Sequence, residues 1–306
     1  MAGGLGGCGI GMPTESTDGL AAFAEELTRF AETMRMAPLL PIIAQMRRPV
    51  RVAVCGRGGV GRSTVEQALR RRGVHVVGEA SAEVRVLVIA EVLKPEDQAA
   101  IASSELPMVI VLTKADLMAD VSGSVADVPM IGLLATVTAL DDDLVAALRT
   151  FVDEPPDLSS VDAFVESAHS VDRDVRTRLL DLLDRFGIAN ATAALAAGAQ
   201  PTAVVECLQQ LSNVDGVLAR LHAVAAPVRY RRVQQALGGL RALAACTDDE
   251  RLWRFLTADA TVAALTAAAV DVLEGAGAVV DGALQRACAA DVVRGSLRLL
   301  DQAQGG

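Results

Sequence analysis

A glycine-rich stretch, residues 56–64, carries the residue types that bind an anion. Glycine lets backbone N–H groups turn toward a phosphate, and the N-terminus of a following helix adds partial positive charge. The spacing matches the phosphate-binding pattern G-x-x-x-x-G-K-[ST], except that arginine occupies the lysine position. We therefore expect a phosphate site, with Mg²⁺ held by the serine. The residues concerned are Gly56, Gly58, Gly59, Gly61, Arg62, Ser63 and Thr64.

Arg62 is the departure with the largest chemical consequence. In the pattern, lysine places a compact ammonium group against the β- and γ-phosphates, whereas guanidinium is a wider planar fork. Our interpretation is that nucleotide can still bind but that efficient phosphoryl transfer is lost. The alternative is a vestigial loop, kept for its turn and for the start of its helix.

A second motif, Thr113-Lys114-Ala115-Asp116, follows a strongly apolar run. It has the form [NT]-K-x-D, in which the carboxylate accepts hydrogen bonds from guanine N1–H and N2–H and the lysine stem covers the ring. The chain's lysines are Lys94 and Lys114, so a lysine at this place adds weight to the motif. We predict that Thr113, Lys114 and Asp116 bind guanine, with GTP or GDP and Mg²⁺ as cofactors. The alternative is an ordinary polar strand exit.

The interval between Thr64 and Val84 is too short for the switch segments of a working GTPase. It has room for one helix and one short strand, yet a switch threonine and a D-x-x-G turn would both fall there. Residues 120–123 fit D-x-x-G, but they come after the TKAD motif and so lie in the wrong place in the topology. Glu91 follows a hydrophobic strand and is either a metal-binding carboxylate or a solvated strand end. We favour the solvated strand end.

The elements that must position these motifs follow from the hydrophobic pattern. Short apolar runs alternate with helical spacing, which predicts an α/β domain with a parallel sheet. Such sheets bind ligands at the carboxyl ends of their strands, where both motifs fall. Strands are expected over 50–55, 74–77, 84–90 and 108–112 and from 128, and a helix over 95–103.

Composition and charge limit the classes of partner. The chain has 306 residues, 52% hydrophobic and 22% charged, a balance typical of a globular protein. A formal net charge of −10 argues against nucleic acid or an anionic membrane surface as a default partner. The five cysteines are scattered and form no C-x-x-C pair, which favours a reducing compartment. Because no secretory signal is evident and acidic residues interrupt the alanine-rich stretches, we expect a cytoplasmic protein, with peripheral membrane association as the alternative.

Everything beyond a proline-rich break near residue 155 has helical spacing, including a capping box predicted at Thr247 to Glu250. Asp18 or Thr17 is expected to cap the first helix. The expected fold class is α/β, a compact parallel-sheet domain with a P-loop, joined to an all-α helical bundle. The expected segments are a disordered tail (1–19), an N-terminal helical segment packing on the bundle (20–50), a P-loop GTPase-like domain (51–153) and the C-terminal helical bundle (157–306).

Several separated segments together resemble the isoniazid-inducible, dynamin-like GTPase family of bacteria. They are GRGGVGRST in place of G-x-x-x-x-G-K-S-T, TKAD, IGLLATVTALDDDLVAALRTF, LLDRFGIANATAALAAG and QALGGLRALAA. The resemblance implies a GTPase head on a helical bundle built from both ends of the chain, with membrane remodelling at the bundle tip. It also implies a role for each matching residue: Gly56, Gly61, Arg62, Ser63 and Thr64 would face phosphates and Mg²⁺, while Lys114 and Asp116 would face guanine.

The glycine loop is similar to that of partitioning ATPases as well, with Arg57 as its signature basic residue. The TKAD motif and the helical tail favour the GTPase family. Three functional hypotheses remain: a guanine-nucleotide-binding pseudo-GTPase that acts through its helical bundle, a slow GTPase or ATPase, and a structural interaction protein that needs no nucleotide. A homodimer, a heterodimer with a related GTPase, and a membrane surface are the candidate assemblies.

Overall fold

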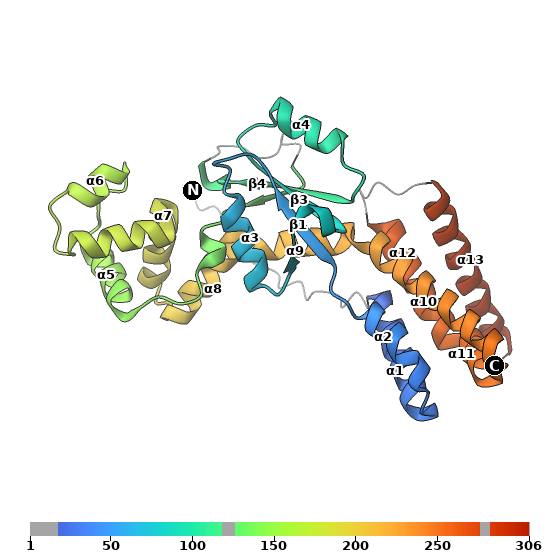
Figure 1. Ribbon diagram of the computed structural model, residues 1–306. Helices are drawn as coiled ribbons and strands as arrows, with labels where there is room; N and C mark the ends of the chain where they lie inside the picture. The colour runs from blue at the N-terminus through green and yellow to red at the C-terminus, as the bar shows by residue number, and fades with distance from the viewer. Residues whose placement is uncertain (1–17, 118–125, 276–281, 306) are drawn as a thin grey trace. The chain divides into compact units, whose positions relative to one another are not determined.

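The computed structural model describes residues 18–117, 126–275 and 282–305, and its contacts divide the chain into two compact units (Figure 1). The sheet unit is Pro49–Val228. The helical unit combines 18–48 with 229–274 and 282–305. The predicted boundary at 153–157 is therefore not where the units divide, because 157–228 belong with the sheet.

The sheet has five parallel strands in the order β2-β1-β3-β4-β5. Their bounds are β1 (Arg51–Cys55), β2 (His75–Val76), β3 (Val84–Ala90), β4 (Met108–Thr113) and β5 (Val128–Met130). The prediction of an α/β fold with a parallel sheet is confirmed. The chain order reverses between β1 and β3, and doubly wound sheets bind ligands outside the carboxyl ends of the strands at such a point.

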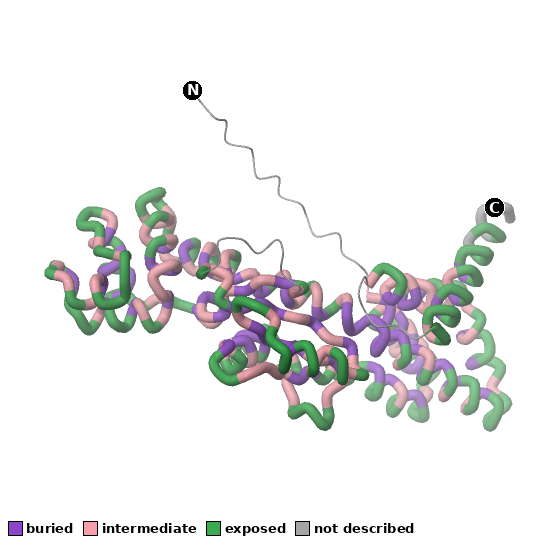
Figure 2. The backbone as a smooth tube through the Cα atoms, turned by 90° about the horizontal axis from the view of Figure 1, so that it is seen from above, coloured by how far each residue is buried: buried purple, intermediate pink, exposed green. Residues whose placement is uncertain are grey.

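The two faces of the sheet bury different side chains, because successive residues of a strand point to opposite sides. On one face, Val84, Val86 and Val88 of β3 lie in a core shared with α3 (Arg62–Arg71) and α9 (Val214–Val224). On the other face, Leu87 and Ile89 lie beside α4 (Pro95–Ala102). β3 is thus buried on both faces. Figure 2 colours the backbone by the burial of each residue, with buried residues in purple.

Helices α5 to α8 form a second core within the sheet unit. This core holds Phe151, Phe164 and Leu183 together with Leu134 of the short helix that follows β5. Hydrogen bonds join β5 to the turn between α8 and α9: Ile131 N–H donates to the Ser212 carbonyl at 3.0 Å. The bounds are η4 (Leu134–Thr136), α5 (Asp142–Asp153), α6 (Val161–Glu166), α7 (Arg173–Ala196) and α8 (Pro201–Ser212).

The helical unit packs through small residues. At Gly19, where α1 begins, a Cβ would lie 2.1 Å from the Ala268 nitrogen of α12, and at Gly295 of α13 a Cβ would lie 2.0 Å from the Thr266 hydroxyl oxygen of α12. The bounds are α1 (Gly19–Met34), α2 (Leu40–Met46), α10 (Ala226–Thr247), α11 (Glu250–Thr257), α12 (Asp259–Glu274) and α13 (Gly282–Gly305). The remaining short helices are η1 (Ala37–Leu39), η2 (Glu79–Ser81) and η3 (Ala115–Leu117).

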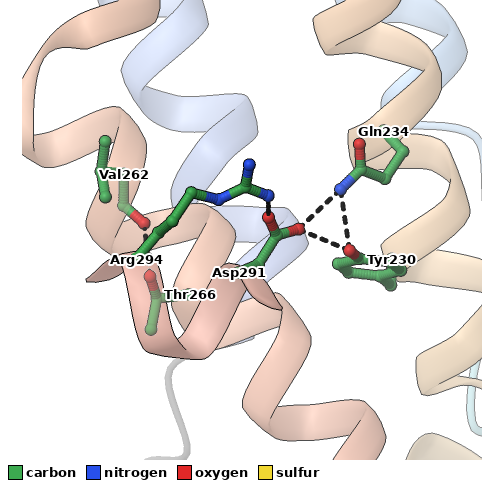
Figure 3. Close-up of polar contacts among 6 residues, drawn as sticks. All are labelled: Tyr230, Gln234, Val262, Thr266, Asp291 and Arg294. Carbon is green, nitrogen blue, oxygen red and sulfur yellow. Dashed lines mark hydrogen bonds and ion pairs between the residues drawn. The ribbon is translucent and has the colours of Figure 1, made fainter. Parts of the chain in front are cut away.

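A buried polar cluster joins α13 to α10 in the helical unit (Figure 3). The carboxylate of Asp291, whose side chain is 1% exposed, accepts hydrogen bonds from the Tyr230 hydroxyl and, at 2.7 Å, from the Gln234 amide. Arg294 of α13 pairs with the same carboxylate. The charge of Asp291 is therefore satisfied from within the unit.

Two local predictions at helix starts had different outcomes. Asp18 caps α1 by accepting a hydrogen bond from Leu20 N–H at 3.0 Å, as predicted. The predicted capping box with Thr247 as its first residue is wrong, because α10 continues through Thr247 and Asp249 caps α11 instead. The predicted tail falls almost wholly on residues outside the described ranges.

Within those ranges, we find no single helix with both the length and the apolar character needed to cross a bilayer. Among the described helices, α11 and α12 taken together have that length and apolar character, but they are bent by 49° relative to each other.

Candidate functional site

The loop between β1 and α3, residues 56–61, has glycine with positive φ at three positions, Gly56, Gly59 and Gly61, and the first and last of these fix its path. Gly56 has φ +145°, and a Cβ there would lie 2.5 Å from the Val88 carbonyl oxygen. Gly61 has φ +83° and stands at the N-cap of α3 without any side-chain cap. Since both conformations are rarely open to other residues, the glycines set the path of the loop.

Thr113 fixes this loop to the sheet. Its buried hydroxyl lies 2.6 Å from the Val60 carbonyl oxygen and 3.0 Å from the Ile89 carbonyl oxygen, in position to donate to either. The side chain predicted to contact guanine thus also holds the end of β4 against the loop. The TKAD motif and the glycine loop are neighbours in space, although they lie far apart in the sequence.

A cavity of about 300 Å³ opens where these two motifs meet. Its volume is at the lower end of the range for small-molecule sites, about 300–1,000 Å³. Its walls come from the loop and α3, the exit of β4, the exit of β5 and the middle of α7. The residues are Gly61, Thr64, Thr113, Lys114, Asp116, Leu117, Ile131, Gly132, Leu133, Leu183, Asp184 and Phe186.

Asp116 and Lys114 supply charge to the cavity. Lys114 is exposed and has φ +56°, while Asp116 is half-buried. Burial raises the pKa of the Asp116 carboxyl, and the nearby Asp184 adds to this effect, whereas its own backbone N–H and Lys114 act in the opposite direction. The charged form of Asp116 is therefore disfavoured in the empty cavity, and a ligand with N–H donors would stabilise it.

A break in α7 forms the wall that faces the sheet motifs. At Asp184 the backbone has φ 56° and ψ 174°, which is not helical and lies in a region used almost only by glycine. Arg185 holds the break in place, because its guanidinium donates to the carbonyls of Leu158 and Ser159 at 3.0 and 2.6 Å. Gly187 then lets the helix pack closely on Leu134, whose Cδ2 would lie 2.7 Å from a Cβ at that position.

The predicted site residues divide into two groups. Five of them line the cavity: Gly61, Thr64, Thr113, Lys114 and Asp116. The others do not line it, namely Gly56, Gly58, Gly59, Arg62 and Ser63. Of these, Arg62 and Ser63 are exposed at the start of α3, so their predicted contacts with phosphate and Mg²⁺ remain predictions.

Arg57, in the loop, has a structural partner on α4. The Arg57 guanidinium lies 3.0 Å from the Asp97 carboxylate, which is buried at the start of α4. Burial alone would raise the pKa of Asp97, but hydrogen bonds from Arg57 and the Lys94 backbone outweigh it and lower the pKa. Arg57 is therefore directed toward α4. Glu91 has φ +64°, and its exposure agrees with the favoured interpretation as a solvated strand-end residue.

No group of three or more metal-binding side chains occurs within the described part of the chain. The D-x-x-G match at 120–123 falls outside that part, so its position is not described.

Two parts of the cavity wall were not predicted. Ile131, Gly132 and Leu133 follow β5, and the rule that ligands bind at strand carboxyl ends could have identified them. Leu183, Asp184 and Phe186 come from α7, and no local pattern signals that this helix breaks and faces the sheet.

Comparison with protein-family models found no match for this chain, and comparison with curated proteins found none either.

Proposed function

We propose that the chain binds a guanine nucleotide in this cavity, with the phosphates toward the glycine loop and the base against Asp116. One observation carries the proposal: a single cavity is lined both by residues suited to phosphate and by residues suited to guanine. Gly61 and Thr64 come from the loop and the start of α3, and Lys114 and Asp116 come from the exit of β4. Chemistry suited to phosphate and chemistry suited to guanine therefore meet at one place.

The start of α3 suits an anion. Its N-cap is Gly61, which has no side chain to accept hydrogen bonds from the first N–H groups of the helix. Those donors are left for water or a ligand, and the helix dipole favours a negative charge there. Thr64, one turn into the helix, brings a hydroxyl to the same wall.

The exit of β4 suits guanine. The carboxylate of Asp116 can accept hydrogen bonds from the adjacent N1–H and N2–H donors of the base, which would compensate for the cost of its burial. The aliphatic stem of Lys114 can cover one face of the ring. Apolar side chains of Leu133, Leu183 and Phe186 line the same cavity and can contact the purine.

We propose binding without efficient turnover. Arg62 replaces the lysine of the phosphate-binding pattern and is exposed outside the cavity wall. Between α3 and β3 the chain forms only β2 and η2, which supports the view that the switch segments of a hydrolytic GTPase are missing. On the resemblance to dynamin-like GTPases, we further propose that the protein acts through its helical unit, as a pseudo-GTPase with a related protein as its partner.

The test is calorimetry of the full chain with Mg²⁺ and GDP, GTP, ADP or ATP. Heat capacity is the appropriate probe because the single tryptophan, Trp253, lies in the helical unit and does not report on the sheet. A ligand at a hundredfold excess over its Kd stabilises the folded state by about 2.7 kcal/mol. We expect guanine nucleotides to raise the melting temperature of the sheet unit and adenine nucleotides not to do so.

Asp116→Ala should abolish this effect, while Asp153→Ala, at an exposed position that ends α5, should leave it intact. Stabilisation by ADP and GDP alike would contradict guanine recognition and favour a general nucleotide site. No stabilisation by any nucleotide would favour the nucleotide-independent structural protein. Turnover that Ser63→Ala removes would support the slow hydrolase.

A further inference from the structure

A second carboxylate shares the cavity with Asp116. Three charged side chains line it, and they are Lys114, Asp116 and Asp184. The two aspartates come from different elements, the exit of β4 and the break in α7, and they are close enough for the charge of Asp184 to add to the raised pKa of Asp116. Since a nucleotide binds with its phosphates away from carboxylates, this part of the cavity suits the base.

The orientation of Asp184 is fixed by its surroundings. Its backbone conformation is nearly restricted to glycine, so an aspartate there costs conformational free energy that the surrounding packing must offset. The flanking Arg185 is held by the carbonyls of Leu158 and Ser159, and Gly187 packs against Leu134. The break in α7 is thus built into the unit, and it directs Asp184 to the cavity wall.

Guanine has more N–H donors than one carboxylate can accept. A carboxylate facing the N1 edge takes N1–H and one hydrogen of the 2-amino group, which leaves the other amino hydrogen without a partner. Leaving a buried donor unpaired is unfavourable, so a second acceptor on the same side of the base would add affinity.

We propose that Asp184 is a second base-reading residue, whose carboxylate accepts a hydrogen bond from the guanine 2-amino group that Asp116 leaves unpaired. This inference rests on the proposed guanine-nucleotide site. It assigns the selection of guanine to a pair of carboxylates, one supplied by the TKAD motif and one by a helix outside the sheet.

Asp184 also has a structural contact that the experiment must separate from binding. Its Oδ1 accepts a hydrogen bond from the Arg185 backbone N–H at 2.6 Å and so caps the second half of α7. Asparagine can make the same cap, and it tolerates positive φ better than most residues. Asp184→Asn is therefore expected to fold. The amide oxygen of the new side chain would accept the Arg185 N–H, so its NH₂ group would face the 2-amino group of guanine. Two donors would then lie opposite each other.

The experiment compares GDP with inosine diphosphate, which lacks only the 2-amino group. Titration calorimetry would measure both Kd values for the wild-type chain, Asp184→Asn and the control Asp181→Asn, whose carboxylate is exposed on the same helix. We expect Asp184→Asn to raise the Kd for GDP about tenfold or more and to leave the Kd for inosine diphosphate nearly unchanged. Asp181→Asn should match the wild type for both.

Two results would overturn the inference while leaving the proposed function in place. One is unchanged GDP binding by Asp184→Asn, with loss of binding in Asp116→Asn. The other is an equal loss of both diphosphates, which would mean that Asp184 acts only by capping α7. If the wild-type chain binds neither diphosphate, the proposed function and the inference both fail. Circular dichroism of each variant would verify that it is folded.

Discussion

Asp291 of the helical unit differs from Asp116 and Asp184 of the sheet unit in how its carboxylate is satisfied. In the helical unit, Asp291 is enclosed and accepts hydrogen bonds from Tyr230 and Gln234, with Arg294 paired to it (Figure 3). In the sheet unit, Asp116 and Asp184 face a cavity, and within the described ranges neither takes part in a salt bridge.

The comparison shows that the hydrogen-bond partners of a carboxylate indicate its role. A carboxylate whose oxygens are all used by the protein contributes to stability and specificity of packing, because removing it leaves the partners unsatisfied. A carboxylate with free acceptor capacity at a cavity is a cost to the empty protein that a ligand can remove. The same residue type thus indicates a structural role at Asp291, as at Asp97, and a candidate binding site at Asp116 and Asp184.

The largest effect is expected from Asp291→Ala. It would leave the buried Tyr230 hydroxyl without its acceptor and remove one of the two acceptors of the half-buried Gln234 amide, which we expect to cost about 3 kcal/mol of unfolding free energy. The fluorescence of Trp253 during urea unfolding reports on this unit. Asp301→Ala, at an exposed position of the same helix, is the control, and an equal midpoint for both variants would contradict a structural role for Asp291.

A smaller effect is expected at the glycine loop. Gly56→Ala would place a Cβ against the Val88 carbonyl oxygen in an unfavourable backbone conformation, and we expect a loss of about 2 kcal/mol in the sheet unit. Gly58→Ala should cost less than about 0.5 kcal/mol, since nothing lies within 4 Å of its Cβ position. Scanning calorimetry measures both. Equal melting temperatures would show that the loop does not approach β3 so closely.

Thr113→Val tests the tie between the two motifs. The substitution keeps the shape of the side chain and removes the donor to the Val60 carbonyl, so we expect a loss of about 1 kcal/mol in calorimetry. Thr138→Val, at an exposed position after β5, should change little. If Thr113→Val weakened GDP binding with no change in stability, the hydroxyl would have to act on the ligand and not on the loop.

Tyr230 offers a pH test of the helical unit. Burial, followed by the hydrogen bond to Asp291, raises the pKa of its phenol above the ordinary value of about 10. The pKa of Tyr230 is higher in the folded state than in the unfolded chain, so the neutral phenol contributes to the free energy of unfolding. This contribution is complete below about pH 10 and is lost as the pH rises further. Tyr230 is the only tyrosine, so its absorbance is a direct readout. We expect tyrosinate to appear only as the unit unfolds; ionisation near pH 10 in the folded protein would contradict the burial.

Asp116 offers the corresponding test of the cavity, with the smallest effect on stability. Its raised pKa means that the charged form disfavours the empty folded state, an effect that grows as the pH rises through the raised value. Asp116→Asn should therefore leave the melting temperature near pH 7 unchanged or slightly higher. Protons would compete with guanine, so the affinity for GDP should fall with decreasing pH before an ordinary aspartate, with a pKa of about 4, would titrate. A pH-independent affinity would exclude Asp116 as the acceptor.

Much of the sheet unit could be predicted because its signals are local. The bounds predicted for β3 are those observed, and β4 ends at the TKAD motif, since β-branched and apolar runs between turn residues specify strands. The spacing of Gly56 and Gly61 likewise predicted the loop. The topology rule then placed this loop and Asp116 on one edge of the sheet.

Other features were decided only by tertiary structure. The sequence shows a helical pattern from residue 157 onward, but the assignment of 157–228 to the sheet unit depends on apolar faces of α7 and α8 that bury against η4. Arg57 matched the signature basic residue of the partitioning-ATPase loop, and only the fold shows that it pairs with Asp97 of α4.

The sequence by itself determined where strands, turns and the glycine loop form, because local hydrogen bonding and burial require particular residue types at regular positions within a few residues. The tertiary structure decided that Asp184 reaches the cavity. That outcome depends on the contacts of Arg185 with the loop at Leu158 and of Gly187 with Leu134, which break a helix that local propensity would continue. Contacts between residues so distant in the chain produce no regular pattern in the sequence. The part of the candidate site that α7 supplies could therefore be identified only from the folded structure.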